Sequence, residues 1–152
     1  MRISAKADYA VRAALEMAAA PEGEPVKGER LAEAQEIPLQ FLEHILLELK
    51  HARLVQARRG AKGGYWLARP AEEITLADVI RAVEGPLANI HENAPEELHY
   101  AGPAERLRDV WVAVRQGLRA VLENVTLADV AGGELPWRID AILNDPEAWI
   151  KR

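Results

Sequence analysis

The sequence predicts a mainly α-helical protein that carries one small β-hairpin. In most of the chain the apolar residues recur every three or four positions, which is the period of an amphipathic α-helix. Between Leu54 and Arg69 the period falls to two on either side of a glycine-rich turn, a pattern typical of a hairpin. The chain of 152 residues suffices for one substantial core, or for a small domain with an appended element, so we do not expect a multidomain enzyme.

The charge of the chain is unevenly distributed. The formal net charge is −5, yet residues 1–70 hold 11 Lys and Arg against 9 Asp and Glu, while residues 71–152 hold 8 against 15. The segment "HARLVQARRGAKGGYWLARP", residues 51–70, contains five basic side chains and no carboxylate. Because a polyanion responds to the local field, this segment can bind one although the whole protein is acidic.

Several function classes are excluded by composition. The chain has no cysteine, which rules out disulfides, thiolate nucleophiles and metal or iron-sulfur sites held by thiolates. Ser4 is the only serine and no His-Glu-x-x-His pair occurs, so nothing indicates an enzyme. Lys6, Asp8, Arg12 and Glu16 interrupt the first apolar stretch, which therefore lacks the pattern of a signal peptide or membrane span. We expect a cytoplasmic protein without a cofactor and without membrane contact.

Three helices are expected in quick succession at the start of the chain. Ser4 can cap a helix over residues 5–20, where alanines dominate and apolar residues recur at one-turn spacing. A short helix follows over residues 28–34. Pro38 suits the first turn of a third helix, because its fixed φ matches a helix and its missing N–H is not needed there.

The third helix has one apolar and one polar face. The side chains predicted to face inward are Phe41, Leu42, Ile45, Leu46 and Leu49. Those left toward solvent are Gln40, Glu43, His44 and Lys50. After this helix, "LVQARR" and "YWLAR" predict two short strands joined by "GAKGG", since glycine reaches positive φ angles without penalty. That turn lacks the G-x-x-x-x-G-K-[ST] spacing of a nucleotide-binding loop, and no helix follows it.

The second half of the chain predicts a linker and a long helix. Thr75 and Asp78 form a capping-box pattern for a fourth helix, which a Gly-Pro pair ends before an acidic, proline-rich linker. A helix over residues 104–125 would span about 33 Å at 1.5 Å per residue, more than the first unit could cover. A second copy of the same helix is the predicted partner. The apolar stripe of this dimerisation helix consists of Leu107, Val110, Trp111, Val114, Leu118, Val121, Leu122 and Val125.

The predicted division of the chain has three parts. They are a first unit over residues 1–86, a linker over 87–103, and a dimerisation helix with a C-terminal tail over 104–152. The four letters TLAD occur at residues 75–78 and again at 126–129, which indicates a reused helix cap and not a repeat architecture. The tail is short and mixed, and its two Trp residues are the side chains with which it could pack back on the long helix.

Helix, helix, helix and hairpin, in this order, describe a winged helix-turn-helix. In that arrangement the third helix enters the DNA major groove and the hairpin touches the phosphate backbone or the minor groove. Arg58, Arg59 and Lys62 at the hairpin tip then have a function, because the enhanced negative potential of a narrow minor groove attracts arginine. Taken alone, a basic turn is more often a solvated surface, and a winged helix can also act as a protein-interaction module without DNA.

Four consecutive segments resemble the Rrf2 family of bacterial transcription regulators: "MRISAKADYAVRAALEMA", "IPLQFLEHILLELKHARLV", "RRGAKGGYWLARP" and "EITLADVIRAVEGPL". The resemblance covers residues 1–87 closely. The segment "LRDVWVAVRQGLRAVLENVTLADV" is similar to the dimerisation helix of that family and the turn that follows it. The cysteine-free linker and "LADVAGGELP" are most similar to an actinobacterial branch.

The resemblance implies a homodimer that binds a partly palindromic operator on double-stranded DNA, usually as a repressor. The DNA-contacting residues are then expected to be Leu39, Gln40, Glu43, His44, Lys50, Arg58, Arg59 and Lys62. The start of the third helix would read bases, since glutamine can pair with adenine and glutamate can accept from cytosine N4. Arg59 corresponds to the minor-groove arginine of the family, although the turn "GAKGG" departs from the common G-P-G-G-G form.

The linker departs further from the family. Many members hold an iron-sulfur cluster there with three cysteines, and this chain has none, so we expect neither a cluster nor a metal. His91 and His99 lie in the linker beside Glu92, Glu96 and Glu97, and scattered side chains of this kind are more often solvated than metal-bound.

The resemblance also bears on regulation. Cluster-free relatives control cysteine and sulfur metabolism, which implies a small-molecule metabolite or a protein as the effector. We expect its signal to enter between Gly85 and Leu107, where the first unit joins the dimerisation helix. Trp66, Tyr100, Trp111 and the linker histidines His91 and His99 could line a small pocket there, although large aromatic rings are more often core packing.

Overall fold

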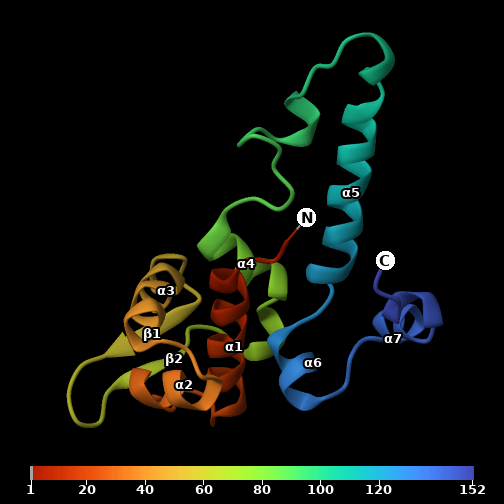
Figure 1. The fold of residues 1–152 in the computed structure, drawn as a ribbon. Coiled ribbons are helices and arrows are strands. Elements are labelled where there is room, and N and C mark those ends of the chain that lie inside the picture. Colours follow the sequence, from red (N-terminus) through yellow and green to blue (C-terminus); the bar gives the residue numbers. More distant parts are fainter. Residues whose placement is uncertain (1) are drawn as a thin grey trace.

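The observed elements follow the predicted order (Figure 1). The computed structural model describes residues 2–152, and over these residues no helix has the length and apolar character needed to cross a membrane. The helices and strands are α1 (Ala5–Ala19), α2 (Gly28–Gln35), α3 (Leu39–His51), β1 (Val55–Arg58), β2 (Gly64–Leu67), α4 (Leu76–Glu84), α5 (Leu107–Leu122), α6 (Leu127–Gly132) and α7 (Trp137–Leu143). Short 3-10 turns are η1 (Ala71–Glu73), η2 (Pro95–Glu97), η3 (Gly102–Ala104) and η4 (Pro146–Trp149). The predicted fold class, mainly α with a small hairpin, is confirmed.

Helix α1 begins at a side-chain cap and lies at the centre of the N-terminal unit. The Ser4 Oγ accepts a hydrogen bond from the Ala7 N–H at 3.0 Å, as the sequence predicted. The buried face is made of small residues and one methionine: Ala7, Ala10, Ala13, Ala14 and Met17. Small side chains let neighbours approach closely, and α1 accordingly contacts α2, α3, α4, α6 and β2.

The hydrophobic core lies between α1, α3, α4 and α6. Its fully buried side chains include Leu31, Leu42, Ile45, Leu46, Leu49, Ile74, Val79 and Leu127. Leu127 belongs to α6, which follows the long helix in the sequence. The N-terminal unit is therefore completed by a segment from well beyond residue 86.

The two TLAD segments both form helix caps and lie side by side. In each, the threonine hydroxyl accepts from the aspartate N–H at 3.1 Å, and the aspartate side chain accepts from the threonine N–H in return. The Leu76 N–H donates to the Val125 carbonyl and the Leu127 N–H to the Ile74 carbonyl, at 2.9 Å each. This pairing ties the segment after α5 to the start of α4, so the chain leaves the N-terminal unit and returns to it.

Two predictions about the long helix are wrong. Helix α5 begins at Leu107 and not at residue 104, because Ala104 belongs to the 3-10 turn η3. Val125 was predicted to lie on the dimerisation stripe, but it follows the end of α5 and is only 3% exposed within the protomer. No residue of α5 itself is buried in the described protomer, and Val110 is half exposed.

The wing is an antiparallel hairpin of β1 and β2, with Arg58 opposite Gly64. Both strands are shorter than the predicted segments. The N–H and the carbonyl of Val26 each hydrogen bond to Tyr65 at 2.8 Å, which adds a third strand position that the sequence did not reveal. Gly64 has a φ of +147°, and a Cβ there would lie 2.6 Å from the Val26 carbonyl oxygen. Glycine is therefore required at this position for both its φ and its close contact.

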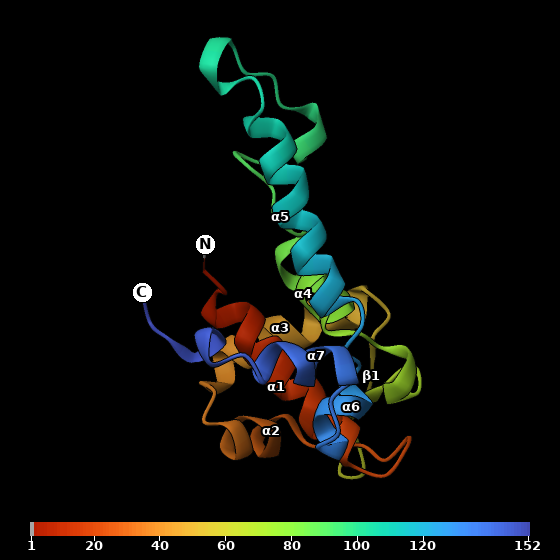
Figure 2. The same cartoon turned by 90° about the vertical axis from the view of Figure 1, so that its right-hand side faces the viewer.

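Helix α5 stands away from the N-terminal unit, and residues 86–106, here called the arm, run outward from α4 along one side of it (Figures 1 and 2). Arg115 Nη1 lies 2.6 Å from Glu96 Oε2, and Trp111 Nε1 donates to the Tyr100 hydroxyl at 3.2 Å. Hydrogen bonds from its own backbone and from Arg115 hold the pKa of Glu96 below its usual range. The arm is thereby attached to the middle of α5.

The structure separates the three aromatic residues for which the sequence left open a pocket at the joint or core packing. Trp111 of α5 donates a hydrogen bond to Tyr100 of the arm, but Trp66 lies on β2, where the Arg58 guanidinium is 6.0 Å from its ring centre. Trp66 lies on the second strand of the short hairpin, on the side where β2 is near η1. Trp66 therefore belongs to the wing and not to the joint between Gly85 and Leu107.

Candidate nucleic-acid interface

Helices α2 and α3 are joined by a turn of three residues. Glu36 closes α2 with a φ of +52°, and its N–H donates to the Ala32 and Glu33 carbonyls. Ile37 is 4% exposed and its N–H donates to the Ala32 carbonyl at 2.9 Å, which anchors the turn in the core. Pro38 occupies the N-cap of α3, where a missing N–H costs nothing. The turn therefore fixes the angle between the two helices of a helix-turn-helix.

The inward face of α3 follows the predicted stripe with one exception. Leu42, Ile45, Leu46 and Leu49 are buried, whereas Phe41 is 43% exposed and its prediction is wrong. At 100° per residue Phe41 lies about 90° from the centre of the buried stripe. Its ring packs edge-on against Tyr9 instead, with 5.6 Å between the ring centres.

The opposite face of α3 is uncovered. The residues of this helix expected to contact DNA are all exposed: Leu39, Gln40, Glu43, His44 and Lys50. Leu47 is 50% exposed on the same side, and sequence reasoning missed it because an apolar helix residue is expected in the core. The exposed stripe runs the length of α3, about 20 Å at 1.5 Å per residue.

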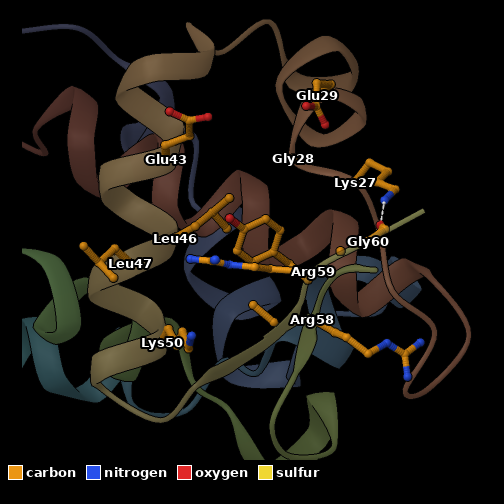
Figure 3. A pocket seen from close by; sticks show the side chains of 13 residues that line it. Lys27, Gly28, Glu29, Glu43, Leu46, Leu47, Lys50, Arg58, Arg59 and Gly60 are labelled. Atoms are coloured by element: carbon orange, nitrogen blue, oxygen red, sulfur yellow. Dashed lines mark hydrogen bonds between the residues drawn. The ribbon is translucent and has the colours of Figure 1, made fainter. Parts of the chain in front are cut away.

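The two arginines at the tip of the wing point in different directions (Figure 3). Arg58 Nη2 donates to the Lys62 carbonyl at 3.1 Å, and its guanidinium lies near the Trp66 ring, so it is engaged by its own hairpin. Arg59 extends across the space between the wing and α3. Of the two, Arg59 presents its guanidinium to a molecule placed beside α3.

A groove of about 530 Å³ separates the wing from α3 and the start of α2 (Figure 3). The charged side chains on its walls are Lys27, Lys50, Arg58 and Arg59, together with Glu29 and Glu43. Lys27 Nζ donates to the Gly60 carbonyl at 2.6 Å and so links the wing tip to the residue before α2. Sequence reasoning missed Lys27, because a single lysine in a loop forms no pattern.

The histidines of the arm lie apart from this groove. His91 and His99 are exposed, and His99 Nδ1 lies 2.9 Å from the Glu97 carbonyl oxygen. Within residues 2–152 no three His, Asp or Glu side chains come together as ligands for a metal ion. The arrangement in the arm is that of a solvated acidic loop.

Comparison with known proteins identifies relatives that match both the N-terminal unit and α5. The model of the Rrf2 family, described as iron-dependent transcriptional regulator, matches residues 3–133. Rv1287 of Mycobacterium tuberculosis, whose name describes it as a helix-turn-helix-type transcriptional regulator, is 51% identical to this chain over 148 residues. These residues are 97% of this chain and 92% of that protein. CymR of Bacillus subtilis, a helix-turn-helix transcriptional regulator, is 33% identical over 131 residues, covering 86% of this chain and 90% of CymR.

Solved structures show the same fold. The structure of CymR from B. subtilis, the global cysteine regulator of that organism, matches with a TM-score of 0.72 and 32% identity, over 87% of this chain and 97% of that one. The structure of T. potens IscR matches with a TM-score of 0.68 and 29% identity, over all of this chain and 93% of that one. The predicted winged helix-turn-helix is thereby confirmed.

The residues of this chain do not fit the iron dependence that the family description states. Iron-sulfur clusters are held chiefly by thiolates, and the chain has no cysteine. The histidines and carboxylates in the described part of the chain form no cluster of three that could replace them. The family match nevertheless spans most of the chain, from the start of α1 to the end of α6. The chain belongs to the Rrf2 family of winged helix-turn-helix, DNA-binding transcriptional regulators.

Proposed function

We propose that this protein is a sequence-specific transcriptional regulator that acts as a repressor. It binds a partly palindromic operator as a homodimer. One observation carries the proposal: Arg59 of the wing faces a groove beside the exposed stripe of α3. A helix of about 10–12 Å diameter fits the B-DNA major groove, which is about 12 Å wide. With α3 in that groove, the wing reaches the adjacent backbone and minor groove.

The roles of the contact residues follow from their chemistry. Gln40 and Glu43 lie on the first turns of α3, where Gln can bond adenine and Glu can accept from cytosine N4, and Leu39 offers an apolar contact. Lys50 and Lys62 carry charges suited to phosphates, which position the protein without reading sequence. Arg59 is placed for a narrow minor groove, whose negative potential attracts its guanidinium.

The homodimer is supported by the surface of α5. This helix carries an apolar stripe, yet none of its residues is buried in the described protomer. A second copy of α5 would cover that stripe, and a two-fold dimer would present two α3 helices to half-sites about one DNA turn apart.

The likeness to CymR supports control of sulfur or cysteine metabolism, with a small molecule or a protein as the effector. We place the entry of the signal in the arm and the joint before it. Gly85 joins α4 to the arm with a φ of +80° and a ψ of −159°, a conformation open to glycine. A small change in this joint would alter the spacing of the two α3 helices and hence the affinity for the operator.

The alternative function is a protein-interaction module that uses the winged helix without DNA. Neither function makes the protein an enzyme. A selection of genomic fragments by the purified protein separates the two. We expect enrichment of fragments that share a partly palindromic sequence. A selection without any shared sequence would favour the interaction module.

Removal of the base-reading side chains should relax specificity. We expect Gln40→Ala and Glu43→Ala each to reduce discrimination at one base pair by about 1–3 kcal/mol, because each removes a hydrogen bond to a base edge. The measurement is affinity for a set of operators that carry single base-pair changes. His51→Ala, at the far end of α3, serves as the matched control and should leave the base preference unchanged. An equal loss on every sequence would show that Gln40 and Glu43 position the protein and do not read bases.

Iron should be absent from the protein purified without oxygen. The chain lacks the thiolates that hold a cluster, so metal analysis should give far less than one iron per protomer and the visible absorption spectrum should lack a cluster band. Operator affinity should be the same before and after treatment with a chelator. Stoichiometric iron with a visible band would contradict this expectation.

A further inference from the structure

The C-terminal tail, residues 134–152, carries an uncovered apolar surface. Five of the large hydrophobic side chains that the structure leaves exposed lie on α7, on η4 or directly after η4: Trp137, Ile142, Leu143, Trp149 and Ile150. Trp137 and Trp149 are 73% and 71% exposed. Exposed aromatic surface gathered in this way is typical of an interaction site.

The tail lies on the same side of the molecule as the open face of α5. In Figure 1 the arm covers one side of this helix and α7 lies on the other side, beside its lower end. Figure 2, seen from that other side, shows both α5 and α7 facing the viewer. The arm is held by Glu96 and Tyr100 through Arg115 and Trp111, and α5 presents Val110, an exposed residue of its apolar stripe, beside those contacts. The apolar tail therefore continues the face proposed for dimerisation.

Helix α5 is small for the sole contact of a stable dimer. Within its 16 residues the apolar stripe offers seven side chains, from Leu107 to Leu122. A specific interface of standard size involves about 20–30 residues on each partner. A dimer with an interface of that size needs additional surface next to α5, and the exposed side chains of the tail provide it.

An antiparallel pairing of two α5 helices gives the tail a definite position. The two-fold axis brings the first turn of the partner's α5 beside the last turn of this one, which is the end where α7 lies. We propose that the tail of each protomer packs on the first turn of the partner's α5, near the partner's Val110, and so completes the interface at both ends of the helix pair. This inference rests on the proposed homodimer.

Cross-linking tests the contact directly, because the chain has no cysteine and an introduced thiol is the only one present. Arg106→Cys places a thiol before α5, and Asn144→Cys places one directly after α7. Arg106 precedes α5, and α7 lies beside the other end of that helix (Figure 1), so within one protomer the length of α5, about 24 Å, separates the two thiols and places them beyond the reach of a disulfide. Full-length protomers of the first variant are mixed with size-tagged protomers of the second and then oxidised. We expect a disulfide-linked species of mixed size, and none when Gln56→Cys on β1 replaces Arg106→Cys.

A second variant removes the contact without a thiol. Trp137→Ser should raise the dimer dissociation constant by about 30-fold, the effect of losing one interface hot spot, while Leu47→Ser on α3 should leave it unchanged. Sedimentation of the full-length chain measures both. A wild-type dimer with no mixed cross-link and no effect of Trp137→Ser would overturn the position of the tail and leave the homodimer intact. A monomeric wild-type chain would overturn the homodimer and, with it, the tail contact.

Discussion

Val114→Asp should convert the protein into a monomer that no longer binds its operator tightly. Val114 lies in the middle of α5, on the stripe that a second copy of the helix would cover, so the substitution would place an unpaired carboxylate in the interface. Loss of the second half-site contact removes the gain from bivalent binding, which is about 100-fold or more. Leu118→Asp, one turn further along the helix, should act in the same way.

The fold of the N-terminal unit should survive this change, because no residue of α5 contributes a buried side chain to its core. Circular dichroism should show unchanged helix content, and sedimentation should show the monomer. Gln116→Asp is the matched control, since it adds the same charge at an exposed position of the same helix. A Val114→Asp protein that sediments as a full dimer would move the interface to another surface.

Arg59→Ala should weaken operator binding by about 2 kcal/mol, or roughly 30-fold, with the largest effect at A·T-rich flanks. The reason is the direction of its side chain, which extends over the groove beside α3 (Figure 3). Affinity for operators with A·T-rich and G·C-rich flanks measures the effect. Because a narrow minor groove depends on the flanking sequence, the loss should be smaller on G·C-rich flanks.

The neighbouring arginine provides the control. Arg58 donates to the Lys62 carbonyl and lies near the Trp66 ring, so Arg58→Ala should affect binding less than Arg59→Ala. Equal losses for the two variants would mean that the wing contributes only general positive charge. A larger loss for Arg58→Ala would reverse the roles assigned to the two side chains.

The sequence predicted those parts of the fold that depend on local patterns. The caps of α1 and α4, the buried leucines of α3 and the glycine turn of the wing each depend on residues within a few positions of one another. Periodicity is visible at that range, since a helix or hairpin buries one face whatever its neighbours are. The prediction that Phe41 faces inward is wrong because this residue lies at the edge of the buried stripe, where the packing of α1 decides how exposed it is.

The contacts that the sequence did not predict join distant segments. Pairing of the segment after α5 with the start of α4 places Val125 and Leu127 in the N-terminal unit, and no periodicity indicates it. The hydrogen bond from Lys27 to the Gly60 carbonyl joins two loops, and neither loop has a sequence pattern that predicts it. The residue pattern alone likewise could not distinguish Arg58 from Arg59, because their difference lies in side-chain direction (Figure 3), and only the family resemblance singled out Arg59. These are tertiary effects that override local preference.

The dependence of operator affinity on salt tests the central claim, specific DNA binding by the wing and α3 of a dimer. Lys50 and Lys62 offer two phosphate contacts per protomer, or about four per dimer, which gives a slope of log K against log salt of about −4. We expect this slope on the selected operator, together with at least about a 1,000-fold preference over a shuffled sequence of the same composition at physiological salt. Equal, salt-independent affinity for the two DNA fragments would contradict it.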